Sequence, residues 1–230
     1  MKGYSIIDNI QLNEKVTFIR VRPTDVSITI RHVFSTLTSI SWLNDFDLEY
    51  VKKSFKARAE PTIQYLKEKI NQGHSDAITT DTGEIVVSEL ARQSIISELS
   101  YLDIPIGELL KQQKSGNPGF DFFTENLSET ILFGEAKYVN GINAYNNSFS
   151  QILRFIKEKR DETDLLDIRD FCSKNALNNV EKGGKGFVGA FSSTNISTKK
   201  LIENIKTNSN FIDACSHSEI ICVAVDVWTT

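Results

Sequence analysis

The chain has 230 residues, of which 40% are hydrophobic and 24% are charged, and its formal net charge at pH 7 is −4. This composition is typical of a globular protein, and the length is enough for one large domain. No apolar stretch reaches the roughly 20 residues needed to span a bilayer, and the N-terminus lacks the apolar run of a signal peptide, so we expect a cytoplasmic location. An acidic chain is poorly suited to hold nucleic acid unaided, because phosphate binding is mostly cationic.

The three cysteines, Cys172, Cys215 and Cys222, are widely spaced and form no Cys-x-x-Cys pair. Their odd number and spacing indicate neither a zinc site nor a disulfide framework, so we expect buried free thiols. The histidines are isolated, and no nucleophile motif of the Gly-x-Ser-x-Gly kind is present. The sequence therefore argues against an esterase or a protease.

Residues 1–75 are interpreted as an N-terminal α/β extension that serves for partner docking. Residues 16–22 and 26–32 carry β-branched side chains in near alternation on either side of a Pro-Thr-Asp turn, which predicts a β-hairpin. From residue 47 to about residue 70 the apolar spacing becomes helical, and Pro61 is expected to start a second helix within that span.

Residues 76–230 are predicted to form a mixed α/β core. A polar stretch precedes a helix over residues 84–102, whose apolar residues are spaced for one face. A strand is expected around residues 104–111. Further along, the pattern predicts strands over 120–124 and 131–139, an amphipathic helix over 148–160, a short helix near 165–173, a strand near 186–192, a helix near 198–205 and an apolar strand over 220–228.

The charged residues that point to chemistry lie in the two strands 120–124 and 131–139. Glu135 and Lys137 are two positions apart in a strand, so their side chains project from the same face. Positions 121 and 135 are symmetric about residue 128, so a hairpin turning there would place Asp121 across from Glu135, with Cβ atoms about 5 Å apart. The surrounding strand is apolar on both faces, and burying charges there is costly unless they are paired or bind a metal ion.

Two adjacent carboxylates repel each other, and a divalent cation would relieve that repulsion. Oxygen ligands suit Mg²⁺ or Mn²⁺, which would polarise a phosphate and lower the pKa of a bound water. Lys137 would orient that water or stabilise the developing negative charge. The alternative is a structural Glu135–Lys137 ion pair with an unrelated Asp121, because a Glu-x-Lys triplet is common by chance.

This pattern resembles the PD-(D/E)XK nuclease superfamily, whose core is a helix, a three-stranded meander, a helix and further strands. The resemblance covers about residues 84–228 and implies a restriction-endonuclease-like fold with a mixed central sheet flanked by helices. It implies that Asp121 and Glu135 are metal ligands and that Lys137 is the catalytic lysine. The proline that usually precedes the aspartate is replaced here by Phe120.

Residues 83–87, 119–121 and 132–137 are more narrowly similar to the HamA family, the nuclease subunits of the Hachiman anti-phage defence system. That resemblance implies a DNA-degrading effector held in check by a superfamily 2 helicase partner, HamB. Two alternatives stay open. One is that the chain is a non-catalytic assembly or regulatory subunit with a vestigial nuclease fold. The other is that it is a stand-alone restriction-type endonuclease, although it shows no evident base-reading module.

Three further residues are candidates for the same site. Members of the superfamily often carry another acidic metal ligand on the helix before the sheet, and Glu84 fits that role better than Glu89. The competing interpretation is that Glu84 favours a helix N-terminus and that Glu89 is solvated. Related nucleases also often carry a glutamine after the motif strand, which Gln151 would match, but Ser148 and Gln151 equally fit a capping box.

Overall fold

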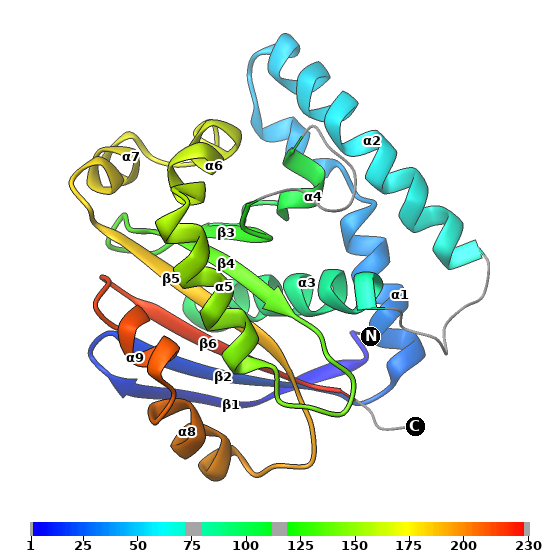
Figure 1. Cartoon of the computed structure of the whole chain (residues 1–230). Coiled ribbons are helices and arrows are strands. Elements are labelled where there is room, and N and C mark those ends of the chain that lie inside the picture. Colours follow the sequence, from blue (N-terminus) through cyan, green and yellow to red (C-terminus); the bar gives the residue numbers. More distant parts are fainter. Residues whose placement is uncertain (1, 72–79, 112–118, 228–230) are drawn as a thin grey trace.

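Within residues 2–71, 80–111 and 119–227, which the computed structural model describes, six β-strands form one mixed sheet with helices on both faces (Figure 1). The strand order is β1-β2-β6-β5-β4-β3. The four inner strands run parallel, and each edge strand is antiparallel to its neighbour. The predicted α/β class and the mixed sheet flanked by helices are therefore confirmed.

The elements have the following bounds. The strands are β1 (Tyr4–Asn13), β2 (Val16–Pro23), β3 (Phe122–Glu125), β4 (Ile131–Lys137), β5 (Lys185–Ser193) and β6 (Ile220–Asp226). The helices are α1 (Val26–Leu37), α2 (Glu49–Asn71), α3 (Thr80–Leu99), α4 (Gly107–Leu110), α5 (Tyr145–Lys157), α6 (Arg160–Ile168), α7 (Lys174–Glu181), α8 (Thr198–Lys206) and α9 (Ser209–Ala214), with a 3₁₀ turn η1 (Ser41–Asp45). None of these helices is both long enough and apolar enough to cross a membrane.

Strand β4 shows why the sheet is covered on both sides. Its residues are buried on both faces, as expected for a central strand in a parallel sheet. Ile131 and Phe133 belong to the apolar layer that contains α5, α7, α8 and α9. Leu132 and Ala136 belong to the opposite layer, which contains α1 and α3. Alternate side chains of this one strand therefore pack into the two apolar layers on opposite faces of the sheet.

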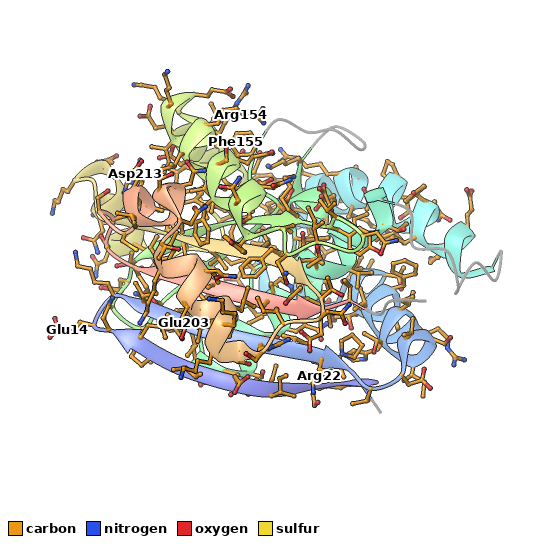
Figure 2. All side chains as sticks on the ribbon, turned by 60° about the horizontal axis from the view of Figure 1, so that its bottom comes forward. Glu14, Arg22, Arg154, Phe155, Glu203 and Asp213 are labelled. Atoms are coloured by element: carbon orange, nitrogen blue, oxygen red, sulfur yellow. The ribbon has the colours of Figure 1, made fainter. Side chains whose placement is uncertain are left out.

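The predicted N-terminal hairpin is wrong in its second half. Residues 16–22 do form a strand, β2, but its antiparallel partner is β1, and residues 26–37 form helix α1. The Asp25 side chain caps α1 by accepting a hydrogen bond from the backbone N–H of Ile28 at 2.8 Å. Strand β1 was missed because it is an edge strand with many polar residues. Glu14 marks the turn of the β1–β2 hairpin and Arg22 its open end (Figure 2).

Two further local predictions are also wrong. Pro61 lies inside one continuous helix, α2, and starts no second helix. Packing maintains the helix across the proline, since Phe55 and Ala59 before it and Ile63 after it are all buried. The strand expected over residues 104–111 is instead the one-turn helix α4.

The remaining core predictions hold more closely. Helix α3 covers most of the predicted span 84–102, and β4, α5, β5, α8 and β6 occur where helices and strands of those types were expected. The cysteines are free thiols, with Cys222 buried and Cys172 and Cys215 half-buried. The predicted domain boundary at residue 75 falls outside the described residues. Strand β2 nevertheless pairs with β6, so the N-terminal strands continue the sheet of the core.

Candidate functional site

The β3–β4 hairpin has the register expected from the sequence. Phe122 pairs with Gly134 and Glu125 pairs with Ile131, so the hairpin turns about residue 128. Gly134 allows this pairing, because a Cβ there would lie 2.4 Å from the ring of Phe122. The next pair in this register would join residues 121 and 135.

Asp121 is fixed at the end of the hairpin by backbone contacts. Its N–H donates to the carbonyl of Gly134 at 2.8 Å, and its Oδ2 accepts from the N–H of Ala136 at 2.7 Å. Burial raises the pKa of Asp121 to about 6, although the Ala136 N–H and the Lys137 ammonium act in the opposite direction. The carboxyl is thus held beside the motif strand in a partly desolvated setting.

Glu135 is the most unusual residue of the site. It is 1% exposed, and within the described part of the chain neither carboxylate oxygen has a hydrogen-bond partner. The Nζ of Lys137 lies 3.0 Å from Oε1, which is ion-pair distance outside hydrogen-bond geometry. Burial and the nearby Asp121 raise the pKa of Glu135 well above its usual range. A buried carboxylate with so few hydrogen bonds and charged partners costs free energy to keep ionised. It is therefore suited to binding a cation.

Lys137 lies between two carboxylates. Its Nζ is 3.2 Å from Oε1 of Glu84 on α3 and 3.0 Å from Oε1 of Glu135. Burial lowers the pKa of Lys137, but the charges of Glu135, Asp121 and Glu84 outweigh burial and raise the pKa overall. Lys137 is therefore an ammonium ion at neutral pH, held at the open end of the cluster.

The structure separates the two acidic candidates on α3. Glu84 joins the cluster through Lys137, whereas Glu89 lies on another side of the helix, as five residues at about 100° each require. Glu89 is fully buried, not solvated, because the guanidinium of Arg92 donates two hydrogen bonds to its carboxylate, each at 2.7 Å. The solvated interpretation of Glu89 is wrong, and Glu89 does not join the site.

Gln151 lines the same cavity as Asp121 and Lys137. The capping box proposed for Ser148 and Gln151 is wrong, because α5 already begins at Tyr145. The hydroxyl of Ser148 instead donates to the backbone carbonyl of Glu135 at 2.9 Å, which fixes α5 against the motif strand.

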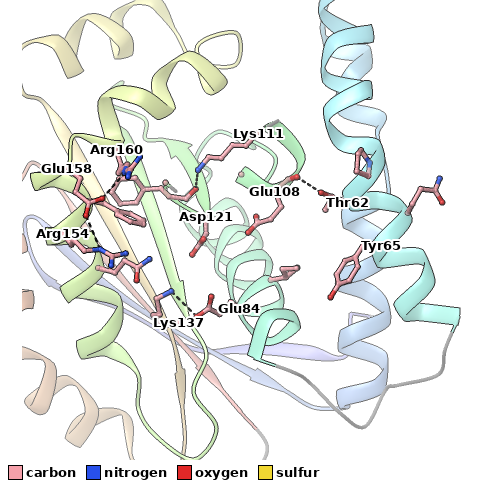
Figure 3. Close-up of a pocket in the computed structure, with 18 of the residues that line it drawn as sticks. Thr62, Tyr65, Glu84, Glu108, Lys111, Asp121, Lys137, Arg154, Glu158 and Arg160 are labelled. Atoms are coloured by element: carbon pink, nitrogen blue, oxygen red, sulfur yellow. Dashed lines mark hydrogen bonds and ion pairs between the residues drawn. The ribbon is translucent and has the colours of Figure 1, made fainter. Parts of the chain in front are cut away.

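The cluster opens into a cleft of about 950 Å³ between α2 and α4 on one side and α5 and the start of α6 on the other (Figure 3). Sequence reasoning missed two of its charged residues, Glu108 and Lys111, because they lie in the segment predicted as a strand. The Oε2 of Glu108 is buried without a hydrogen-bond partner in the described residues, and burial together with Asp121 raises the pKa of Glu108 to about 8. Lys111 donates to the carbonyl of Phe120 at 2.7 Å.

The described residues contain no group of three His, Cys, Asp or Glu side chains placed to hold a metal ion together. The fit of a divalent cation therefore rests on a pair, Asp121 and Glu135, with Glu84 beyond Lys137. Such a pair suits Mg²⁺, which usually takes one or two protein carboxylates and keeps several waters. The unpartnered oxygens of Glu135 are consistent with that ion.

Comparison of this chain with protein-family models, curated proteins and solved structures finds no match. No family is therefore assigned to the chain on that basis, and no activity carries over from a relative. Function is inferred from the geometry of the cluster and the cleft.

Proposed function

We propose that this protein is a metal-dependent DNA nuclease that hydrolyses phosphodiester bonds at Asp121, Glu135 and Lys137. The observation that carries the proposal is the carboxylate of Glu135, which is buried, has no hydrogen-bond partner in the described residues and lies beside a lysine below an open cleft. A purely structural buried carboxylate is normally satisfied by hydrogen bonds. The sequence resemblance to PD-(D/E)XK nucleases supports the same assignment.

Asp121 and Glu135 would hold a Mg²⁺ or Mn²⁺ ion, which supplies polarisation of the phosphate and a bound water of lowered pKa. The chain's own part is to orient these groups. The N–H of Ala136 fixes one oxygen of Asp121, and the Ser148 hydroxyl fixes the strand at Glu135. Orientation of this kind matters because reacting groups must stand within a few tenths of an ångström of a productive geometry.

Lys137 would stabilise the negative charge that develops on the phosphate during attack. Its ammonium is held by Glu84 and Glu135 without being buried fully, since its side chain is 17% exposed. Gln151 faces the same cleft and would help to hold the substrate or the attacking water. Glu84 acts here by positioning Lys137, whose ammonium lies 3.2 Å from its Oε1.

The second candidate function is that of a non-catalytic assembly or regulatory subunit. The two short contacts of Lys137 favour it, because a lysine already paired with Glu84 and Glu135 can be a structural ion pair. In that case the site binds no divalent cation and cuts no DNA.

The test is DNA cleavage in the presence of Mn²⁺ by the purified chain and by two variants, Glu135→Gln and Lys137→Ala. Removal of a group that stabilises transition-state charge costs about 100- to 1,000-fold in rate, so we expect each variant to lose at least that much activity. Glu203→Gln removes an exposed carboxylate on α8 and should leave the rate unchanged. Equal cleavage by wild type and both site variants would exclude this site, and binding of no Mn²⁺ would favour the non-catalytic alternative.

We further propose that a superfamily 2 helicase partner, similar to HamB, delivers DNA to this nuclease in an anti-phage defence complex in the bacterial cytoplasm. The net charge of −4 supports a delivered substrate, because the chain has little general attraction for phosphates. A stand-alone restriction-type endonuclease is the competing possibility. Tagged protein isolated from its native host should carry a helicase in stoichiometric amount, whereas sequence-specific duplex cutting by the isolated chain would favour the restriction-type alternative.

A further inference from the structure

The shape and charge of the cleft above the cluster bear on the form of DNA that can reach Asp121. The cleft has a volume of about 950 Å³, within the range of ligand-binding pockets. The charges and aromatic rings on its walls therefore bear on whether one strand or a duplex enters.

The two walls of the cleft differ in charge. On the α5–α6 side, the charged lining residues are Arg154, Glu158 and Arg160, and the side chain of Arg154 is 59% exposed. Arg154 and Arg160 both pair with Glu158, which leaves the segment with a positive excess. On the α2–α4 side, the lining anions Glu68 and Glu108 outnumber the lining cation Lys111, which pairs with Asp164 at 3.3 Å.

This asymmetry matches a single phosphate backbone. A duplex carries a backbone on each side and would require cations on both walls, whereas one strand has its phosphates on one side and its bases on the other. Arg154 and Tyr65 lie on opposite sides of the cavity (Figure 3). Tyr65 is 39% exposed, and aromatic rings are the usual stacking surface for unpaired bases.

The α2 wall is held in place by contacts with α4 and α6. The hydroxyl of Thr62 donates to the carbonyl of Glu108 at 2.8 Å, and Arg58 donates to the carbonyl of Leu110 at 3.2 Å. Arg58 also pairs with Asp167 on α6 at 3.1 Å. These contacts keep Tyr65 across the cleft from α5.

We propose that this cleft binds single-stranded DNA, with the phosphates along Arg154 and Arg160 and a base stacked on Tyr65. The proposal rests on the proposed nuclease function, since it names the substrate class of the same site. A duplex would be cut only where a single-stranded end or opened segment enters the cleft.

Binding is measured by fluorescence anisotropy with a fluorescein-labelled single-stranded DNA oligonucleotide and with the duplex of the same sequence, with Ca²⁺ replacing Mn²⁺. We expect the single strand to bind at least about tenfold more tightly. Tyr65→Ala should weaken binding of the single strand by about 5- to 150-fold, the range expected for one stacked base. Arg154→Ala should reduce the slope of log affinity against log salt concentration by about 0.7.

Three matched variants serve as controls. Tyr65→Phe keeps the ring and should bind like wild type. Tyr50→Ala removes a tyrosine from the same helix that is 71% exposed and outside the cleft, and Lys200→Ala removes an exposed cation on α8. Neither should change affinity by more than about twofold, as expected for residues that touch no substrate. Figure 2 shows Arg154 of α5 and Glu203 of α8 on different parts of the molecule. Thermal melting confirms that each variant is folded.

Cleavage of the same substrates with Mn²⁺ separates the two proposals. Equal or tighter binding of duplex, unchanged binding by Tyr65→Ala and Arg154→Ala, or binding of neither DNA would overturn the single-strand proposal. Cleavage of blunt duplex at the rate of single strands would overturn it while leaving the nuclease function intact. Single-strand binding that depends on Tyr65, without cleavage of any substrate, would support the cleft assignment and overturn the nuclease function.

Discussion

Two buried glutamates of this protein, Glu135 on β4 and Glu89 on α3, are equally shielded from solvent and very differently bonded. Glu89 is fully buried and accepts hydrogen bonds from Arg92 at 2.7 Å and from Gln93 at 2.6 Å. Glu135 is 1% exposed and accepts no hydrogen bond from the described residues, and its charged partner is the Lys137 ammonium at 3.0 Å. Burial alone therefore does not distinguish the two acids, whereas their hydrogen bonds do, because a buried structural carboxylate is normally satisfied by several of them.

The largest expected difference between the two glutamates appears when the charge of each is removed in turn. Glu89→Gln leaves Arg92 as a buried cation without its main partner, so we expect a loss of about 3–5 kcal/mol in the free energy of unfolding, measured with urea. Glu135→Gln should change that free energy by no more than about 1 kcal/mol in the absence of metal, because Lys137 keeps Glu84 as a charged partner when its ion pair with Glu135 is lost. Glu98→Gln, an exposed change on the same helix as Glu89, is the control. Equal losses for Glu89→Gln and Glu135→Gln would show that the two acids are both structural.

A smaller effect is expected where α3 meets the motif strand. A Cβ on Gly83 would lie 2.4 Å from the ring of Tyr138, so Gly83→Ala should cost about 1–3 kcal/mol through overpacking. It should also displace Glu84 from Lys137 and lower the cleavage rate. In a Tyr138→Ala background the ring is absent, and the same glycine substitution should cost much less. An equal cost in both backgrounds would contradict a role for this contact.

The site carboxyls also contribute to the pH dependence of stability. Burial raises the pKa of Asp121 from 3.8 to about 6 and that of Glu108 from 4.5 to about 8, so the folded state binds more protons than the unfolded state in these ranges. The stabilisation that each group contributes is complete below its unfolded pKa and is lost as pH rises through its folded pKa. The melting temperature without metal should therefore fall between about pH 4 and pH 8.

Mn²⁺ should reverse that trend, because the ion binds the ionised carboxyls of the folded state. We expect the rise in melting temperature caused by Mn²⁺ to be larger at pH 8 than at pH 5.5. The double variant Asp121→Asn with Glu135→Gln should show no rise at either pH. A rise that persists in this variant would place the cation elsewhere.

The sequence predicted the parts of the site that depend on local alternation. The register of the β3–β4 hairpin follows from symmetry about residue 128, and the shared face of Glu135 and Lys137 follows from their spacing of two. Glu84 was placed near them through a sequence resemblance, and its contact with Lys137 agrees with that placement.

The parts that were missed depend on contacts between distant residues. Helix α4 has a single turn, and its position is fixed by Thr62 and Arg58 of α2, some 50 residues earlier in the chain. No local pattern around Glu108 reports such contacts, so its role in the cleft could not be predicted. The same reason explains α1, whose residues at 26–32 are β-branched but whose buried positions are selected by packing against α2 and α3.

The parallel pairing of β2 with β6 also determines when the fold can be completed. Val16 lies beside Ile220, so the β1–β2 hairpin has no neighbour in the sheet until almost the whole chain has been synthesised. Contacts between residues so far apart in sequence form slowly, because a long loop must close before they contribute stability. Strands β3, β4 and β5, which carry and support the acidic cluster, lie on the other side of β6. On the ribosome, the β5 edge of the sheet that carries the cluster therefore stays open until the last strand arrives. The sheet is complete only after synthesis of residues 220–226.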